Sequence, residues 1–216
     1  MDAVTKAASE GPKGRLRADK HDAIMAGGTE VFARDGYQRA SIDAIAAAAK
    51  VSTRTIYKHF ADKAALFAAV VADSATRIAD EEVELIGQHL ADLDDPQRIE
   101  SALSGFAVAW TTGTTQSATH RALVGQVHAE AAHLGHEVVE AWWQAGPGRV
   151  LAELSVALQR WGDAGWLPLD DAERAAVQFA QLVSARPGPP ARSVPEAVRK
   201  AWIADGVGVF VRAHRR

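Results

Sequence analysis

The sequence contains no cysteine, few aromatic residues and no long uncharged hydrophobic run. The absence of cysteine excludes disulfide bonds and thiolate metal sites. Aromatic residues make up 6% of the 216 residues, whereas hydrophobic residues make up 48% and alanine is very abundant. This composition favours helices that pack closely through small side chains over a sandwich or barrel.

Segments that would direct the chain to a membrane are not evident. No run approaches the roughly 18 uncharged apolar residues that a membrane helix needs. Residues 1–17 carry positive charge but are followed by no apolar run, so they do not read as a signal peptide. We therefore expect a soluble cytoplasmic protein with no membrane partner.

The net charge of −3 conceals a difference between the two ends of the chain. Residues 1–63 carry 11 Lys+Arg and 8 Asp+Glu, a charge of +3, while residues 64–216 carry 13 and 19, a charge of −6. A basic N-terminal part on an acidic body is compatible with phosphate contact at one end only. A difference this small also arises by chance, so it only supports the motif described below.

Apolar residues recur at helical spacing along most of the chain, and no convincing strand is present. We predict an all-α fold of about nine helices. Residues 1–17 lack periodicity and are expected to form a disordered arm, residues 18–63 a small helical domain, and residues 64–216 a larger one. The helices are expected at about 18–34, 41–49, 52–60, 62–89, 97–112, 117–134, 137–162 (kinked or split at Gly146-Pro147), 170–183 and 195–212, with a proline-rich loop at 186–192.

Residues 41–60 have the organisation of a helix-turn-helix. Ser41 and Ser52 are good N-caps and lie eleven residues apart, so each helix has only about two turns. The turn, 49–51, has three residues and ends in the apolar Val51, so the two helices must cross steeply around a shared contact. Helices this short are not stable alone and need the preceding and following helices as a platform.

The exposed face of the second short helix has no acidic residue and suits contact with phosphates and base edges. Arg54 is placed to reach a guanine edge, and Tyr57, Lys58 and His59 to anchor phosphates. Lys63 is expected to add a backbone contact at the start of the next helix. An ordinary solvated surface is the alternative for any one of these residues. The predicted DNA-binding residues are Ser41, Ser52, Thr53, Arg54, Thr55, Tyr57, Lys58, His59 and Lys63.

The stretch IDAIAAAAKVSTRTIYKHFADKAALF resembles the DNA-binding domain of the tetracycline-repressor (TetR) family of transcription regulators. The likeness covers about residues 18–71. Two features depart from the family pattern: Gly27-Gly28 stands in a helix that is usually alanine-rich, at a cost of about 1 kcal/mol per glycine, and Lys50 replaces a frequent turn glycine. The matching positions are Phe32, Gly36, Tyr37, Ser41, Ile45-Ala46, Val51, Thr55-Ile56-Tyr57, His59-Phe60 and Lys63.

The C-terminal part is similar to the subgroup of this family with an AefR-like C-terminal domain. The similarity is carried by Ala145-Gly-Pro-Gly-Arg, Gly165-Trp-Leu, Asp170-Asp171 and Ala175-Ala176. It implies a helical effector-binding domain whose last two helices pair with a partner subunit.

Aromatic residues concentrate in this C-terminal part and predict a pocket for an apolar or aromatic effector. The alternative is that they fill a core or a dimer interface, which is the favoured reading for Trp161 and Trp166. The predicted effector-pocket residues are Phe106, Trp110, His128, Trp142 and Trp143.

Histidine and glutamate residues between 120 and 137 form no legible metal site. His128 and His133 lie about 140° apart on a continuous helix, and Gly135 is expected to end the helix before His136. We expect no metal, no cofactor and no catalytic residue. An all-helical enzyme that uses the His/Glu cluster at 128–137 is the rival from another class.

A single short helix-turn-helix reads only a few base pairs, so a two-fold partner is expected. Apolar stripes on the last two helices predict the dimer interface, at Phe179, Val183, Trp202, Val209 and Phe210. The sequence as a whole predicts a homodimeric, ligand-responsive regulator, most simply a repressor, that binds a palindromic operator in double-stranded DNA. A family member without any effector is the remaining alternative.

Overall fold

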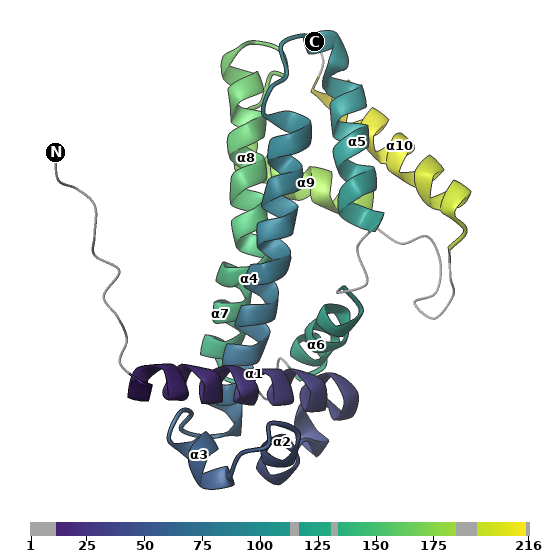
Figure 1. Cartoon of the computed structure of the whole chain (residues 1–216). Helices are drawn as coiled ribbons and strands as arrows, with labels where there is room; N and C mark the ends of the chain where they lie inside the picture. Colours follow the sequence, from purple (N-terminus) through teal and green to yellow (C-terminus); the bar gives the residue numbers. More distant parts are fainter. Residues whose placement is uncertain (1–11, 113–116, 131–133, 185–193, 215–216) are drawn as a thin grey trace, which may run out of the picture. The chain divides into compact units, whose positions relative to one another are not determined.

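The computed structural model describes residues 12–112, 117–130, 134–184 and 194–214, the side chains of 12–16 and 117 excepted, and all regular structure in them is helical (Figure 1). The all-α prediction is confirmed. No helix in these ranges is long and apolar enough to cross a membrane. The elements are α1 (Pro12–Arg39), α2 (Ile42–Ala48), α3 (Thr53–Tyr57), α4 (Lys63–Leu90), the short 3-10 helix η1 (Pro96–Arg98), α5 (Ile99–Thr112), α6 (Ser117–Glu130), α7 (His136–Ala145), α8 (Pro147–Asp163), α9 (Ala172–Ser184) and α10 (Glu196–Ala213).

The described residues form ten α-helices because the predicted helix at 137–162 is divided at Gly146. Gly146 has non-helical dihedral angles (φ −122°, ψ −101°), and Pro147 occupies the first turn of α8, where a missing N–H costs nothing. A Cβ at Gly146 would lie 2.9 Å from the Cβ of Ala75 on α4. The break therefore also lets the chain pass close to α4.

Helix α1 differs from its prediction at both ends. It was expected over 18–34, but it begins at Pro12 and continues to Arg39 across a kink at Gly36. Gly36 has φ 78°, in the left-handed region that glycine adopts without a Cβ clash, so the predicted break lies at the right residue while helical structure resumes beyond it. Residues 12–17 of the expected disordered arm are thus helical, and residues 1–11 lie outside the described residues.

The chain divides into two compact units that do not follow a single cut in the sequence. The first contains the residues up to Val71 together with Thr119–Val139, and the second contains Ala72–Ala118 and Glu140–Arg216. Most of helix α6 therefore belongs to the unit that contains the helix-turn-helix, and it contacts the end of α1. The side chain of Gln126 accepts a hydrogen bond from the Tyr37 N–H at 3.4 Å, and that of Gln38 donates to Glu130 at 2.8 Å.

The first unit is built on an apolar core shared by α1, α2, α3 and the first turns of α4. Phe32 and Phe67 meet edge to face, with ring centroids 5.0 Å apart. Helix α2 comes so close to α1 that a Cβ at Gly27 would lie 2.8 Å from the Ala49 nitrogen. The glycine that departs from the family pattern is therefore required by the close contact. Fully buried members of this core include Ile24, Phe32, Ile45, Ile56, Leu66, Phe67 and Val70.

The second unit encloses a separate core between the C-terminal part of α4 and helices α5, α8, α9 and α10. Phe179 lies at its centre, with its ring 5.2 Å from that of Phe210 and 6.1 Å from that of Phe106. The same core also contains Leu154 and Trp161 of α8 and Ile203 of α10.

Candidate nucleic-acid interface

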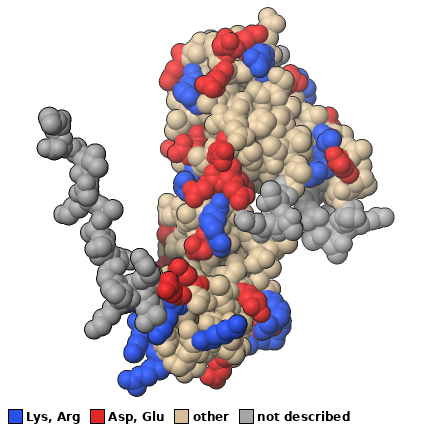
Figure 2. All heavy atoms as spheres, viewed as in Figure 1, with Lys and Arg blue, Asp and Glu red and all other residues tan. Residues whose placement is uncertain are grey.

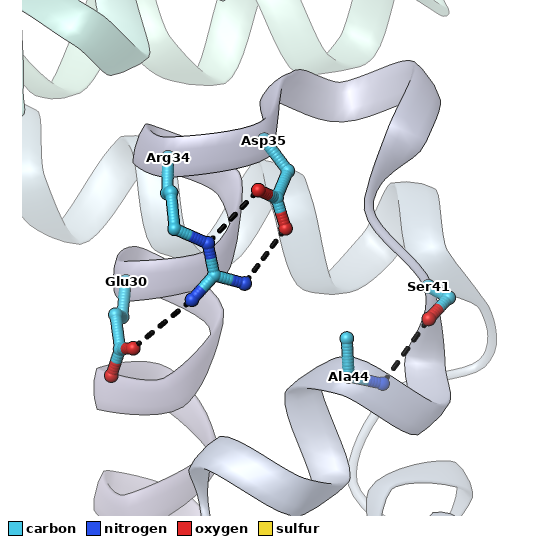
Figure 3. Close-up of polar contacts among 5 residues, drawn as sticks. All are labelled: Glu30, Arg34, Asp35, Ser41 and Ala44. Atoms are coloured by element: carbon cyan, nitrogen blue, oxygen red, sulfur yellow. Dashed lines mark hydrogen bonds and ion pairs between the residues drawn. The ribbon is translucent and has the colours of Figure 1, made fainter.

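Both predicted N-caps are present, and they order the helix-turn-helix. Ser41 Oγ accepts a hydrogen bond from the Ala44 N–H at 3.1 Å (Figure 3), and Ser52 Oγ accepts one from the Thr55 N–H at 3.2 Å. Ser52 Oγ also shares a hydrogen bond with Thr55 Oγ1 at 2.8 Å. The two serines were predicted as DNA-binding residues, and these contacts give them the role of fixing the helix starts.

The turn between α2 and α3 is closed by Lys50 in a left-handed conformation, with φ 53°. Its N–H bonds to the Ala47 carbonyl at 3.2 Å, and the Val51 N–H bonds to the Ala46 carbonyl at 3.0 Å. A side chain in this region costs roughly 1 kcal/mol relative to glycine. Lys50 thus adopts a backbone geometry that glycine takes without this cost.

Helix α3 ends at Tyr57 rather than at Phe60, and the last residues form a tight turn. The His59 and Phe60 N–H groups both bond to the Ile56 carbonyl at 2.9 Å. Ile56 is fully buried and Phe60 nearly so. The apolar side of this segment therefore anchors it to the first unit and leaves the other side exposed.

The exposed side presents Arg54, Tyr57 and Lys58. The Tyr57 side chain is 56% exposed, which is unusual for an aromatic residue. Neither Arg54 nor Lys58 forms an ion pair with any residue that the structure describes. Thr53 and Thr55 are half-buried beside them. The segment thus offers one arginine, one lysine and one phenol to a ligand outside the protein.

His59 is half-buried, and its ring lies 5.9 Å from that of His21 and 6.5 Å from that of Phe60. Burial lowers the pKa of His59, and the nearby charges of Arg17, His21 and Lys20 lower it further. The imidazole is accordingly neutral near pH 7, and its contact with a phosphate would be a hydrogen bond rather than an ion pair.

Lys63 lies at the start of α4, where it was expected, and its side chain is bonded within the protein. Its Nζ donates hydrogen bonds to the carbonyl oxygens of Tyr37 at 2.9 Å, Ala40 at 3.1 Å and Gln38 at 3.4 Å. It also lies 4.6 Å from the centre of the Tyr37 ring. All three of its N–H donors are used on carbonyls at the end of α1, so Lys63 fastens α1 to α4 in the absence of DNA.

Arg34 is likewise engaged within the protein (Figure 3). Its guanidinium donates to both carboxylate oxygens of Asp35, at 2.9 and 2.8 Å, and to Glu30 at 3.3 Å. This fork holds the pKa of the Asp35 carboxyl below its usual range. Other Lys and Arg side chains gather over the surface formed by α1, α2 and α3 (Figure 2).

The predicted effector residues fall into separate groups. Phe106 and Trp110 stack on one face of α5, with ring centroids 5.2 Å apart. Trp142 and Trp143 meet edge to face on α7 at 6.4 Å. His128 belongs to the first unit, whereas the other four belong to the second. The structure therefore brings together Phe106 and Trp110 within the second unit.

Sequence reasoning missed Glu82, the carboxylate beside Trp110. Glu82 is partly buried on α4, and burial raises its pKa to about 7, while a hydrogen bond from Trp110 opposes the shift. The signal was present in the spacing, because Glu82 falls in phase with the buried Ala75, Ala79 and Ile86. Because Glu82 follows Asp80 and Glu81 directly, it resembles part of an exposed acidic run in the sequence.

The predicted interface residues divide into two sets. Phe179, Val183 and Phe210 are 0–3% exposed in the core of the second unit, so their side chains are enclosed by the chain itself and are not available to a partner. Trp202 and Val209, on the outer side of α10, are 42% and 47% exposed. Val156, Val177 and Val198 are also exposed.

No group of three His, Asp or Glu side chains that could hold a metal ion occurs in the part of the chain that the structure describes. His133, which the rival enzymatic reading requires, lies outside the described residues.

Comparisons with known proteins match both parts of the chain. The family model for bacterial regulatory proteins of the tetR family matches residues 24–70, and the model for the C-terminal domain of AefR-like transcriptional repressors matches residues 101–216. No curated protein gives a significant match.

Solved structures with the same architecture include other regulators. A TetR-family transcriptional regulator from Mesorhizobium loti is 25% identical with a TM-score of 0.77, over 91% of this chain and 97% of that one. The flavonoid-responsive regulator FrrA is 24% identical with a TM-score of 0.66, over the same shares of the two chains. GusR of Salmonella enterica is 20% identical with a TM-score of 0.61, over 97% and 99%. At 24% and 20% identity, the similarity to FrrA and GusR shows a shared fold alone.

Proposed function

We propose, from the premise that this chain belongs to the TetR family of bacterial regulatory proteins with an AefR-like C-terminal domain, that it is a ligand-responsive repressor. It binds a palindromic operator as a homodimer and leaves it when a small molecule binds. Members of this family are transcriptional regulators and are generally not enzymes. The observation that carries the proposal is the exposed set Arg54, Tyr57 and Lys58 on a capped and buried platform.

The chemistry of this set matches that of a DNA groove. A guanidinium near the start of α3 can bond to the O6 and N7 atoms of guanine. Tyr57 and Lys58, near the end of α3, supply a hydroxyl and an ammonium group for phosphates. Because the first unit is held together by Lys63 and the two caps, these groups keep a defined arrangement without DNA, which reduces the entropy lost on binding.

The operator test is a mobility shift at fixed salt, on DNA fragments selected by the protein itself. Arg54→Ala and Tyr57→Ala should each weaken operator binding by about 5- to 150-fold, because each removes a contact worth about 1–3 kcal/mol. Arg98→Ala is the matched control, since Arg98 lies on η1 in the second unit and pairs with Asp94. Unchanged binding by both α3 variants would refute the docking of this helix.

The homodimer is proposed to form through the exposed apolar side of α10. Val198, Trp202 and Val209 follow one another at spacings of four and seven residues, which places them on one side of the helix. A second copy of the chain would cover this side, and two helix-turn-helix units could then read half-sites about 34–36 Å apart. Dimer symmetry would thereby supply the specificity that one short α3 lacks.

The dimer proposal predicts that Trp202→Glu is monomeric at about 10 μM protein and loses at least about tenfold in operator affinity, because a carboxylate would be buried at the interface. Sedimentation at several concentrations measures the first effect and mobility shift the second. Lys200→Glu places the same residue about 200° away around α10 and should remain dimeric. If Trp202→Glu sediments like the wild-type protein, this side of α10 is not the interface.

Effector binding in the second unit is proposed to favour a conformation in which the two recognition helices no longer match the half-sites. Helix α4 contributes residues to both units, and it therefore connects the two functions in one element. By thermodynamic linkage, the operator must weaken effector binding by the same factor by which the effector weakens operator binding. Equal effector affinity with and without operator would exclude this regulation.

A further inference from the structure

Glu82 is a carboxylate in an inward position of α4. Ala75, Ala79, Ile86 and Leu90 are at most 5% exposed and mark the face of α4 that packs into the second unit. Glu82 follows Ala79 by three residues and precedes Ile86 by four, so it belongs to the same face. Its neighbour Glu81 is exposed.

An aromatic wall lies beside this carboxylate. The Trp110 ring stacks on Phe106 with an interplanar angle of 18°, and Phe106 stacks in turn on Phe179. The Trp110 side chain donates a hydrogen bond to the Glu82 carboxyl. Burial raises the pKa of Glu82, and this hydrogen bond lowers it by a smaller amount. Glu82 and Trp110 are both only partly buried, so neither side chain is fully enclosed by the protein.

No positive charge is paired with this carboxylate in the part of the chain that the structure describes. No Lys, Arg or His within the described ranges forms an ion pair with Glu82. The arginines near it in α4 and α8 are engaged elsewhere: Arg77 pairs with Asp73 at 3.0 Å and Arg149 with Asp80 at 2.6 Å. An uncompensated carboxylate in apolar surroundings is costly, and consistently the pKa of Glu82 is raised to about 7.

We propose that Glu82 and Trp110 are part of the effector site and that they select an organic cation, a positively charged nitrogen on an apolar or aromatic body. The carboxylate supplies the opposite charge, and the face of the Trp110 ring attracts the cation through its quadrupole. The fully buried Phe106 backs the Trp110 ring, so the body of the ligand would rest on the exposed part of that ring. This inference rests on the proposed function, because it names the class of effector that the regulator answers to.

The test uses benzyltrimethylammonium and its neutral isostere neopentylbenzene as probes of the purified full-length protein. The cation should bind the wild-type protein at least about tenfold more tightly than it binds Glu82→Gln, since the variant loses a charge-assisted contact. The neutral isostere should bind both proteins equally. Glu81→Gln removes the same charge one residue away and should bind the cation like the wild-type protein.

Proton release distinguishes a direct contact from a structural role. The quaternary cation carries no acidic proton, so any proton released on binding comes from the protein. Calorimetry in two buffers at pH 7 should detect up to about half a proton released by the wild-type protein and none by Glu82→Gln, because a bound cation favours the ionised carboxylate. Between pH 6 and pH 8 the affinity of the wild-type protein for the cation should rise about tenfold as Glu82 ionises.

Three results would overturn the inference: equal affinity of the cation for wild-type protein and Glu82→Gln, preference of the wild-type protein for the neutral isostere, or no saturable binding of the cation at millimolar concentration. Operator binding by the wild-type protein without any probe is measured alongside. Operator binding that persists while the cation fails would refute the choice of effector alone. Failure of the wild-type protein to bind any selected operator would refute the proposed function instead.

Discussion

Replacing Gly27 with valine should abolish operator binding and lower the free energy of unfolding by about 3 kcal/mol. A Cβ at position 27 would lie 2.8 Å from the nitrogen and 3.2 Å from the Cα of Ala49. These are backbone atoms at the C-cap of α2, so no side-chain rotation can relieve the contact. Helix α2 would have to move, and the turn that orients α3 would move with it. Chemical denaturation measures the first effect and mobility shift the second.

A matched pair of alanine variants separates this contact from helix propensity. Gly27→Ala should destabilise the protein by about 1–3 kcal/mol, whereas Gly125→Ala on α6 should stabilise it by about 0.5–1 kcal/mol. Both substitutions gain the same helix propensity, but a Cβ at Gly125 meets nothing within 4 Å. Effects of the same sign at the two positions would show that the approach of α2 to α1 is looser than the structure has it.

Truncating Phe179 to alanine should cost about 3–5 kcal/mol of unfolding free energy. Phe179 is fully buried and lies between the rings of Phe106 and Phe210, so its removal leaves a cavity that rigid helices cannot fill. The loss should be independent of protein concentration, because the contacts are made within one chain. Urea denaturation at several protein concentrations measures both the size and this independence.

Gln178→Ala, at the exposed position next to it on α9, should change stability by less than about 0.5 kcal/mol. If the Phe179→Ala monomer instead unfolds like the wild-type protein but no longer dimerises, Phe179 belongs to the dimer interface, as the sequence suggested. The two results separate a core residue from an interface residue at a position where sequence periodicity is the same for both.

The helix-turn-helix was predictable because its determinants are local. Ser41 and Ser52 accept hydrogen bonds from N–H groups three residues ahead, and such contacts depend only on the identity and spacing of nearby residues. The exposed Arg54, Tyr57 and Lys58 follow from the same spacing, because Ile56 and Phe60 must face the core. The proposed effector site was predictable only in part, since Phe106 and Trp110 meet within α5 but Glu82 comes from another helix.

The intramolecular contacts that sequence reasoning did not foresee join distant segments. Lys63 bonds to carbonyls that lie 23–26 residues before it, so no local pattern distinguishes it from a phosphate-binding lysine. Helix α6 packs with the first unit through Gln126 and Glu130, which lie about 90 residues after their partners. A boundary drawn along the sequence cannot show that association.

The sequence by itself determined the all-α class, the two capped short helices and the acid-free face of α3, because helix periodicity, N-capping and turn chemistry act over three or four residues. The tertiary structure alone decided which apolar stripes are core and which are exposed, that Gly27 accommodates α2, and that Lys63 is bonded internally. It also decided that Glu82 lies in an inward position with no ion-pair partner among the described residues. The physical reason is common to all of these. Burial and side-chain pairing depend on which helix faces pack together, and the sequence pattern of one helix identifies its apolar face without identifying the helix that packs against it.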